Sequence, residues 1–269
     1  MGVEETYPML IDHAEDPVEV ARQLKPHFKG KESPKELLRY FQSHGMYHRG
    51  EAALKDAKAL GKENAWEAVE KLFISYRKKW GGPDIPVFIL PHKRNGFFSP
   101  GHHKSGLAFP DKLLLFLSPN LPPKELEALF VHEYHHVCRL QRQKKAVQDY
   151  SLGDSSVLEG CAEYAVSNLV GEAYLAPWTK RYTEAYLKAY WKNHFKEAIS
   201  IERKDKRHDQ YLLGNNRHPY MIGYSMGYYM VQTYAQDQQL AIADTLSFPS
   251  EVFIKHFTEK IETSKGSRK

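Results

Sequence analysis

The chain has 269 residues, of which 42% are hydrophobic and 26% are charged. This length and composition suffice for a sizeable core in one large or two small domains, as in an ordinary soluble protein. The net charge is +5, and residues 139–145 and 203–207 are locally basic. Acidic residues are interleaved elsewhere and no nucleic-acid motif accompanies these runs. We therefore interpret both as solvated surface and expect no nucleic-acid partner.

Hydropathy also argues against a membrane protein. No stretch is long and apolar enough to span a bilayer, so we expect no membrane partner. Residues 1–5 include two glutamates and lack the basic and apolar regions of a signal peptide. The sequence therefore predicts a cytoplasmic protein.

The first third of the chain is expected to be mainly helical. Apolar residues recur at helical intervals in residues 17–25, 34–43 and 65–79, and the last run ends at Trp80-Gly81-Gly82. We predict an N-terminal helical layer, residues 1–82, that packs on a second region, residues 83–269, in one compact unit.

Short apolar runs bounded by Gly, Pro or Asn begin the second region. They predict buried strands at residues 84–90 and 112–117, with a third at 106–109. Residues 95–106 are rich in Gly, Pro, Asn and Ser and predict a loop that could form a flap over a cleft. His102 and His103 in this loop could bind a second metal ion, although exposed loop histidines usually do not.

A helix is predicted to open at Pro122-Pro123, and it carries the HExxH pattern from His132 to His136. Residues four apart lie on one face of a helix, so these two histidines can bind one metal ion while Glu133 holds a water molecule. Catalytic zinc takes three protein ligands, so one more is required. The alternative is a chance match, which the helical context disfavours. His135 is interpreted as a supporting or surface residue.

A second helix is predicted to begin near Asp154-Ser155-Ser156 and to continue over residues 157–175. Glu159 is the candidate third ligand. Glu163, one turn further on, could accept the second ring N–H of a ligand histidine. The alternative is that Ser156 and Glu159 form a capping box, in which the glutamate only accepts the N–H of the cap residue.

Small residues in the same helix also carry predictions. Gly160 and Ala162 would let the second helix approach the first closely. The two cysteines, Cys138 and Cys161, each lie two residues from a candidate ligand. That offset points to the opposite side of a helix, so we expect both thiols in the core rather than on the metal.

The HExxH pattern followed by Glu159-Gly160-Cys161-Ala162-Glu163-Tyr164 resembles the gluzincin clan of zinc peptidases. Thermolysin-like and aminopeptidase N-like gluzincins take their third ligand from a glutamate on the helix after HExxH, and the present segment is most similar to the aminopeptidase N type. A metzincin would have glycine and histidine where this chain has Arg139 and Arg142. More narrowly, residues 84–231 are similar to a bacterial family of predicted zinc-dependent proteases.

This resemblance implies an α+β fold with a thermolysin-like or gluzincin-like core. Its parts would be a small mixed or antiparallel sheet, a zinc helix and a ligand helix, with the N-terminal helical layer added. It also implies Zn2+ as the cofactor and a sheet edge that holds an extended peptide.

Gluzincins of these types further use a tyrosine or histidine from later in the chain to stabilise the oxyanion. We expect this residue within residues 217–229, with Tyr224 and Tyr220 as the leading candidates and His218 after them. Arg217 could instead bind a substrate carboxylate.

Tyrosines and glycines in this segment recur every four residues. Tyr220, Tyr224 and Tyr228 form one series and Gly223 and Gly227 another, which predicts a helix packed through its glycines with phenols along one side. The alternative for each tyrosine is that it fills the core with its hydroxyl at the surface. A similar tyrosine series on a helix predicted at residues 179–199 is interpreted as packing.

Together these patterns predict a zinc-dependent peptide-bond hydrolase acting on a peptide or protein. The metal would activate a water and Glu133 would carry its proton to the leaving amine. One alternative is a zinc-stabilised regulatory protein without activity, against which the presence of Glu133 counts, because a purely structural site has no use for a base. Zinc hydrolysis of a non-peptide amide or ester is the other alternative.

Overall fold

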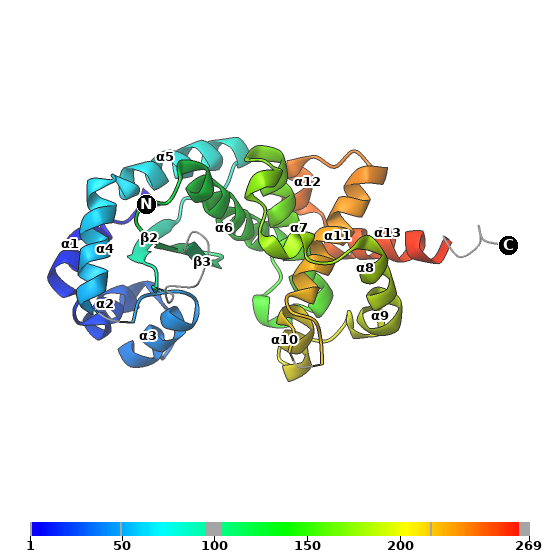
Figure 1. Ribbon diagram of the computed structural model, residues 1–269, viewed down its shortest axis with the longest axis horizontal. Coiled ribbons are helices and arrows are strands. Elements are labelled where there is room, and N and C mark those ends of the chain that lie inside the picture. Colours follow the sequence, from blue (N-terminus) through cyan, green and yellow to red (C-terminus); the bar gives the residue numbers. More distant parts are fainter. Residues whose placement is uncertain (1, 49, 95–103, 216, 264–269) are drawn as a thin grey trace. The chain divides into compact units, whose positions relative to one another are not determined.

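A four-stranded mixed sheet lies in the N-terminal half of the described chain (Figure 1). The computed structural model describes residues 2–48, 50–94, 104–215 and 217–263. Helices make up most of these residues, and the fold class is α+β, as predicted. The chain divides into two compact units, residues 1–137 and residues 138–269.

The sheet of the first unit has the strand order β1-β2-β4-β3 among the described residues. Its strands are β1 (Gly2–Val3), β2 (Pro86–Pro91), β3 (Lys104–Phe109) and β4 (Lys112–Leu117). Strands β1, β2 and β4 run parallel to one another. Strand β3 runs antiparallel to β4 and pairs with it through all six residues. Every residue of β4 is buried, which explains why apolar residues fill five consecutive positions of this strand, residues 113–117. The three predicted strands are confirmed.

Helices surround this sheet. Those of the first unit are α1 (Thr6–His13), α2 (Pro17–Leu24), the 3-10 turn η1 (Lys25–His27), α3 (Pro34–Ser43), α4 (Gly50–Lys62), α5 (Ala65–Trp80) and the greater part of α6 (Pro123–Gln143). The three N-terminal helices predicted from periodicity are confirmed as α2, α3 and α5. Asp16 caps α2, Ser33 and Glu36 form a capping box on α3, and Gly81 ends α5 in the left-handed conformation.

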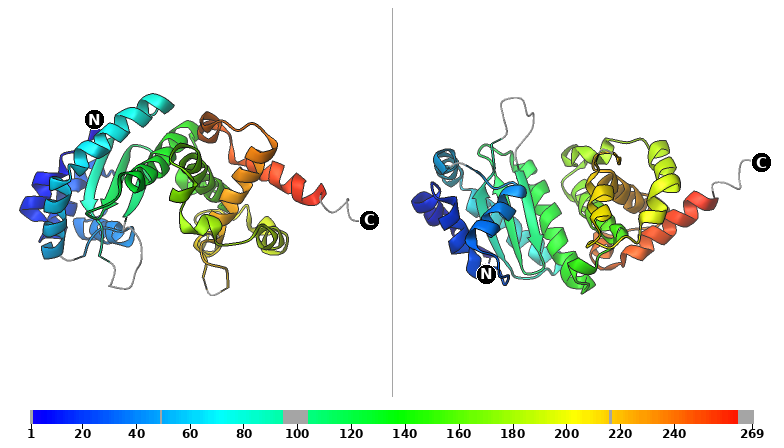
Figure 2. Two further views of the ribbon diagram at one scale, coloured as in Figure 1. Left: turned by 45° about the horizontal axis from the view of Figure 1, so that its top comes forward. Right: turned by 90° about the horizontal axis from the view of Figure 1, so that it is seen from below.

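The two faces of the sheet contact different helices (Figure 2). On one face, Phe88, Leu90, Leu114 and Phe116 join a buried cluster with residues of α1 to α4. On the other side lies α6, and it packs against α5 through aromatic rings. The rings of Trp80 and Tyr134 stack at 5.9 Å between centroids. The helix that carries the HExxH pattern is therefore held in place by the core of its own unit.

The second unit is helical in its described residues. Its elements are η2 (Val147–Asp149), α7 (Leu152–Leu169), η3 (Glu172–Tyr174), η4 (Pro177–Lys180), α8 (Glu184–Tyr190), the π-helical turn η5 (Trp191–Phe195), α9 (Lys196–Ala198), α10 (Lys206–Leu213), α11 (Ile222–Asp237), α12 (Ile242–Ser247) and α13 (Ser250–Thr263). The helix predicted at residues 157–175 ends earlier, at Leu169, and the one predicted at 179–199 is split among α8, η5 and α9.

The central pair of the second unit is α7 and α11, which are in backbone contact. A Cβ on Gly160 would lie 2.7 Å from the backbone nitrogen of Tyr228, and one on Gly227 would collide with the carbonyl of Ser156. The predicted packing of this helix through its glycines is confirmed at Gly227. Gly160 lies at the contact with α11. The predicted close approach of Gly160 and Ala162 to the HExxH helix stays a prediction.

Two expectations about side chains are wrong, and one alternative for a third residue is excluded. Tyr220 does not share a stripe with Tyr224 and Tyr228, because Met221 adopts a left-handed conformation and α11 begins after it. Arg139 is not solvated but only 1% exposed, and it donates to the Thr245 carbonyl at 2.6 Å and to Ser250 Oγ at 3.3 Å. His135 is fully buried against the ring of Trp80, which excludes the surface alternative. Its interpretation as a supporting residue stays a prediction.

The two cysteines are free and buried, as predicted. Within the part of the chain that the structure describes, no helix combines the length and the hydrophobicity needed to cross a bilayer.

Candidate metal centre

Two imidazoles of α6 point at one another. His132 Nε2 and His136 Nε2 are 3.0 Å apart, and the ring centroids are separated by 4.5 Å with nearly perpendicular planes. The four-residue spacing places both side chains on the same face of the helix. Two ring nitrogens that converge in this way are arranged as two ligands of one ion would be.

Glu159 is the third member of the cluster, and its helix starts earlier than predicted. Ser151 is the N-cap of α7, and its side chain forms a capping box with Asp154. Ser156 therefore lies inside the helix, in its second turn. The alternative in which Glu159 merely completes a capping box with Ser156 is wrong, and the carboxylate of Glu159 is not committed to the helix terminus.

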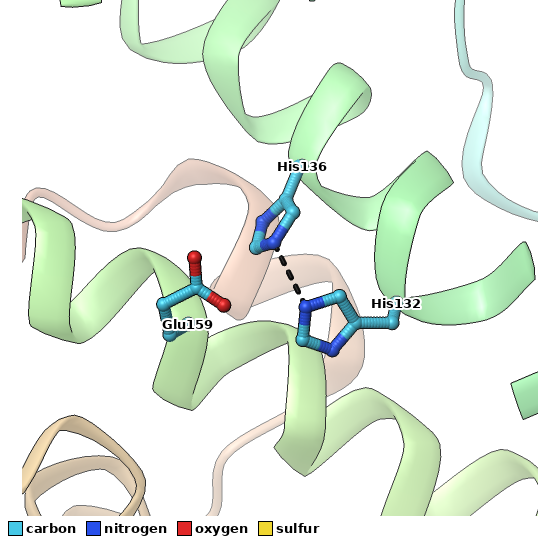
Figure 3. Close-up of side chains that lie close together, drawn as sticks. All are labelled: His132, His136 and Glu159. Carbon is cyan, nitrogen blue, oxygen red and sulfur yellow. Dashed lines mark hydrogen bonds between the residues drawn. The ribbon is translucent and has the colours of Figure 1, made fainter. Parts of the chain in front are cut away.

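One ligand atom from each of His132, His136 and Glu159 lies within 4.8 Å of the others (Figure 3). Figure 3 shows the carboxylate turned toward the two imidazole rings. Four-coordinate zinc with bonds of about 2.0–2.2 Å separates its ligand atoms by about 3.3 Å. The two histidine nitrogens, 3.0 Å apart, are close to this separation, and the Glu159 oxygen lies within 4.8 Å of both. Two imidazoles and a carboxylate form a donor set that fits zinc.

Glu133 lies beside these ligands on α6 and is 9% exposed. Its side chain rests on strand β3. A Cβ placed on Gly106 would lie 2.5 Å from the Cδ and 2.7 Å from the Oε1 of Glu133. The carboxylate therefore lies against the backbone of the sheet's edge strand.

Glu163, predicted to support a ligand histidine, is 4% exposed. Its Oε2 accepts the backbone N–H of Ala176 at 3.0 Å. This bond ties α7 to the segment that leads into η4. The predicted bond to an imidazole stays a prediction.

Tyr224 lies in the first turn of α11. Its ring packs edge to face on that of Trp178, with centroids 5.2 Å apart, and Ser225 Oγ donates to the Trp178 carbonyl. Because Gly160 and Gly227 are in contact, Glu159 and Tyr224 each lie within about one turn of the point where their helices meet.

The other predicted residues of this segment lie outside α11. Tyr220 is 64% exposed, and the guanidinium of Arg181 lies 5.2 Å from its ring centroid. His218 Nδ1 is 2.8 Å from the hydroxyl of Tyr190, and its ring lies 3.9 Å from that of Tyr211. Arg217 is exposed, and its backbone N–H donates to Asn215 Oδ1.

Among the ionisable side chains of the second unit, Cys161 and His218 have shifted pKa values that bear on the candidate chemistry. Burial raises the pKa of the Cys161 thiol to about 11, and the nearby Arg139 only partly opposes this effect. The thiol is therefore protonated at neutral pH and is neither a nucleophile nor a ready metal ligand. Burial, assisted by His194 and Arg217, holds the pKa of His218 below its usual value.

Sequence reasoning missed a hydrogen-bonded chain at the base of α7. Ser155 Oγ is 2.9 Å from Nε2 of His208, whose Nδ1 is 2.8 Å from Asp209 Oδ1. Ser155 precedes Glu159 by one turn. His208 is fully buried, so the chain links α7 to α10 rather than offering a nucleophile to solvent. The sequence signal was a histidine within a polar run, which gave no indication of burial.

Gly106 was missed in the same way, because nothing local distinguishes it from a glycine that ends a loop. The predicted flap spans residues 95–106, of which only 104–106 belong to the described residues. His102 and His103, the possible second metal site, lie outside the described residues. In the part of the chain that the structure describes, one cluster of three or more His, Cys, Asp or Glu side chains could hold a metal ion. It consists of His132, His136 and Glu159.

Comparison with known proteins identifies one family model and two relatives. The family model described as "Predicted Zn-dependent protease (DUF2268)" matches residues 65–255. The "Uncharacterized protein YjaZ" of Bacillus subtilis (strain 168) is 35% identical over 258 residues, which cover 94% of this chain and 98% of that protein. The "Uncharacterized protein YjfC" of the same organism is 25% identical over 147 residues, covering 51% and 48%. No solved structure matches the chain significantly.

Proposed function

This chain belongs to the family of predicted Zn-dependent proteases, and from that membership we propose that it is a zinc-dependent peptide-bond hydrolase of the gluzincin type. The observation that carries the proposal is the convergence of His132, His136 and Glu159 on one point. These residues would hold the zinc ion. When bound, zinc would lower the pKa of a water molecule and polarise the carbonyl of the scissile bond.

Glu133 is the proposed general base. A carboxylate one residue after the first ligand histidine can take a proton from the attacking water and deliver it to the leaving amine. Its low exposure removes competing solvent, and its contact with β3 fixes one side of it. A site that only stabilised the fold would need no such group.

The substrate would pair with strand β3. In the described part of the sheet β3 is an edge strand, with β4 on one side and no described strand on the other. An extended peptide added to this edge would form main-chain hydrogen bonds with residues 104–109. Because the backbone of Gly106 touches Glu133, such a peptide would run directly past the base.

Tyr224 is the proposed donor to the oxyanion. It is held in a regular helix that contacts α7 through glycines, and Trp178 packs on its ring. Its hydroxyl would donate a hydrogen bond to the developing negative charge. Tyr220 and His218 follow it as candidates, because the first is largely exposed and the second already has Tyr190 as a partner. Glu163 would orient a ligand imidazole, and Arg217 would bind a substrate carboxylate.

The test is metal content by elemental analysis together with cleavage of a mixed peptide library before and after chelation. We expect one zinc per chain and cleavage that stops on chelation and returns with zinc. Zinc without cleavage of any peptide would favour a regulatory protein or hydrolysis of a non-peptide amide or ester. A chain that binds no metal would refute the proposal.

A further inference from the structure

Strand β3 has a different neighbour on each face. Side chains alternate along a strand, so residues 105, 107 and 109 share one face and residues 104, 106 and 108 the other. Leu107 and Phe109 pack against the cluster of the N-terminal helices. On the opposite face, Lys104 Nζ lies 2.7 Å from Glu125 Oε2 in the first turn of α6. The even-numbered face is therefore the one that meets the HExxH helix.

Gly106 is the position at which this face meets Glu133. A Cβ at residue 106 would overlap the end of the glutamate side chain, with 2.5 Å to Cδ and 2.7 Å to Oε1. Ordinary van der Waals contact between these atoms requires about 3.5 Å or more. The two groups can share this space only because residue 106 lacks a side chain.

The two partners of this contact differ in freedom. The backbone at Gly106 is paired with Leu115 inside a strand whose six residues all pair with β4. The Glu133 carboxylate stands at the end of a side chain with three rotatable bonds. A methyl group added at residue 106 would therefore displace the carboxylate and leave the strand in place.

We propose that Gly106 is a positioning residue for Glu133, which keeps the carboxylate against the backbone of the edge strand. The catalytic meaning of this contact rests on the proposed function, whereas the contact itself does not. A base must lie within hydrogen-bond reach of the proton that it takes. Displacement of a reacting group by about 1 Å can lower a rate about 100-fold.

A double-mutant cycle in metal-free protein tests the contact. The variants are Gly106→Ala, Glu133→Ala and the double variant, and thermal unfolding is the measurement. We expect Gly106→Ala to lower Tm in the native background and to have little or no effect when Glu133 is already truncated. Equal losses in both backgrounds would overturn the proposal. The proposal would also be overturned if neither Gly106→Ala nor the double variant folded. If the double variant folded and Gly106→Ala alone did not, the result would support the proposal.

Leu107→Ala is the matched control. It removes a side chain from the same strand on the face that contacts the N-terminal helices. It should lower Tm by the same amount with or without the Glu133 side chain. If the Tm loss of Leu107→Ala depended on the Glu133 side chain as strongly as that of Gly106→Ala, the cycle would report only general damage to β3. That result would count against the proposal.

Kinetics and zinc content complete the test. In a peptide-cleaving protein, Gly106→Ala should lower kcat about 100-fold with KM and zinc content nearly unchanged. An unchanged kcat would overturn the positioning role. If the native chain cleaves no peptide, the proposed function fails, and the thermal cycle still decides whether Gly106 places Glu133.

Discussion

The carbonyl of Ser156 lies so close to Gly227 that a β-carbon on residue 227 would collide with it. Ser156 precedes the candidate ligand Glu159 by less than one helical turn, and Gly160 directly follows that ligand and faces the backbone of Gly227 and Tyr228. The ligand-bearing part of α7 is thus held by backbone atoms, which cannot move aside as the end of a side chain can.

Gly227→Ala should therefore destabilise the protein by about 1–3 kcal/mol through overpacking and should weaken zinc binding, because α7 must move. Denaturant unfolding and a zinc-affinity titration are the measurements. Gly153→Ala is the control, since the atoms nearest to a Cβ there belong to the side chains of Ile254 and Ile199 rather than to backbone. Equal effects of the two substitutions would contradict the special role of the backbone contact.

Glu133→Gln should remove the base and keep the metal. We expect turnover to fall by about 100-fold or more, with zinc content unchanged in elemental analysis. Glu127→Gln, on the same helix, is the control, because Glu127 accepts the hydroxyl of Tyr76 and pairs with Lys124. Substantial cleavage by Glu133→Gln would assign the base to another residue.

Glu159→Gln should weaken zinc binding beyond the roughly 10- to 100-fold loss typical of a supporting residue. Asp154→Asn provides a comparison on the same helix. Asp154 belongs to the capping box and accepts Lys145 at 2.7 Å, so its substitution should cost about 1 kcal/mol of stability with zinc affinity retained. The measurement is competition with a chromophoric chelator. Full zinc affinity in Glu159→Gln would remove this residue from the metal site.

Tyr224→Phe should lower kcat about 100-fold, as expected for loss of one hydrogen bond to an oxyanion, without loss of stability or zinc. Tyr228→Phe, on the same helix and 6% exposed, should leave kcat within a few-fold of the native value. Steady-state kinetics on a cleaved peptide would separate them. If Tyr220→Phe or His218→Gln shows the larger loss instead, the donor lies in the segment before α11.

His218 should make stability depend on pH. Burial, with His194 and Arg217, lowers its pKa in the folded protein below the ordinary value of 6.5. The unfolded chain therefore binds a proton more readily, so this contribution to stability is present above about pH 6.5 and is lost as the pH falls through the lower folded value. His218→Asn should flatten the fall in Tm between pH 7 and pH 5. The same slope in both proteins would contradict this assignment.

The fold followed from the sequence where a pattern was local and strong. Five of the six residues of β4, 113–117, form an uninterrupted apolar run after Lys112, and the predicted bounds of the strand agree with the observed ones. The HExxH helix was also found, because its proline start and apolar spacing agree. The start of α7 was misplaced by a few residues, although Ser151 and Asp154 have the spacing of a capping box with aspartate in place of glutamate.

Side-chain environments were harder to predict, because they depend on contacts between residues far apart in the chain. Arg139 lies in a basic run, yet its partners Thr245 and Ser250 are more than a hundred residues away. Tyr220 fits a four-residue period, but the left-handed Met221 excludes it from the helix. Gly106 could be recognised only once β3 was placed against α6.

The buried guanidinium of Arg139 also limits how the chain can be shortened. It donates to the carbonyl of Thr245 in α12 and to the hydroxyl of Ser250 at the start of α13. A fragment ending before α12 would retain every candidate ligand and the base, yet it would leave a charged group in an apolar interior without those acceptors. Such uncompensated burial costs about 3–5 kcal/mol, a large part of the stability of a domain. The last two helices are therefore needed for the metal centre to fold, although neither contributes a ligand to it.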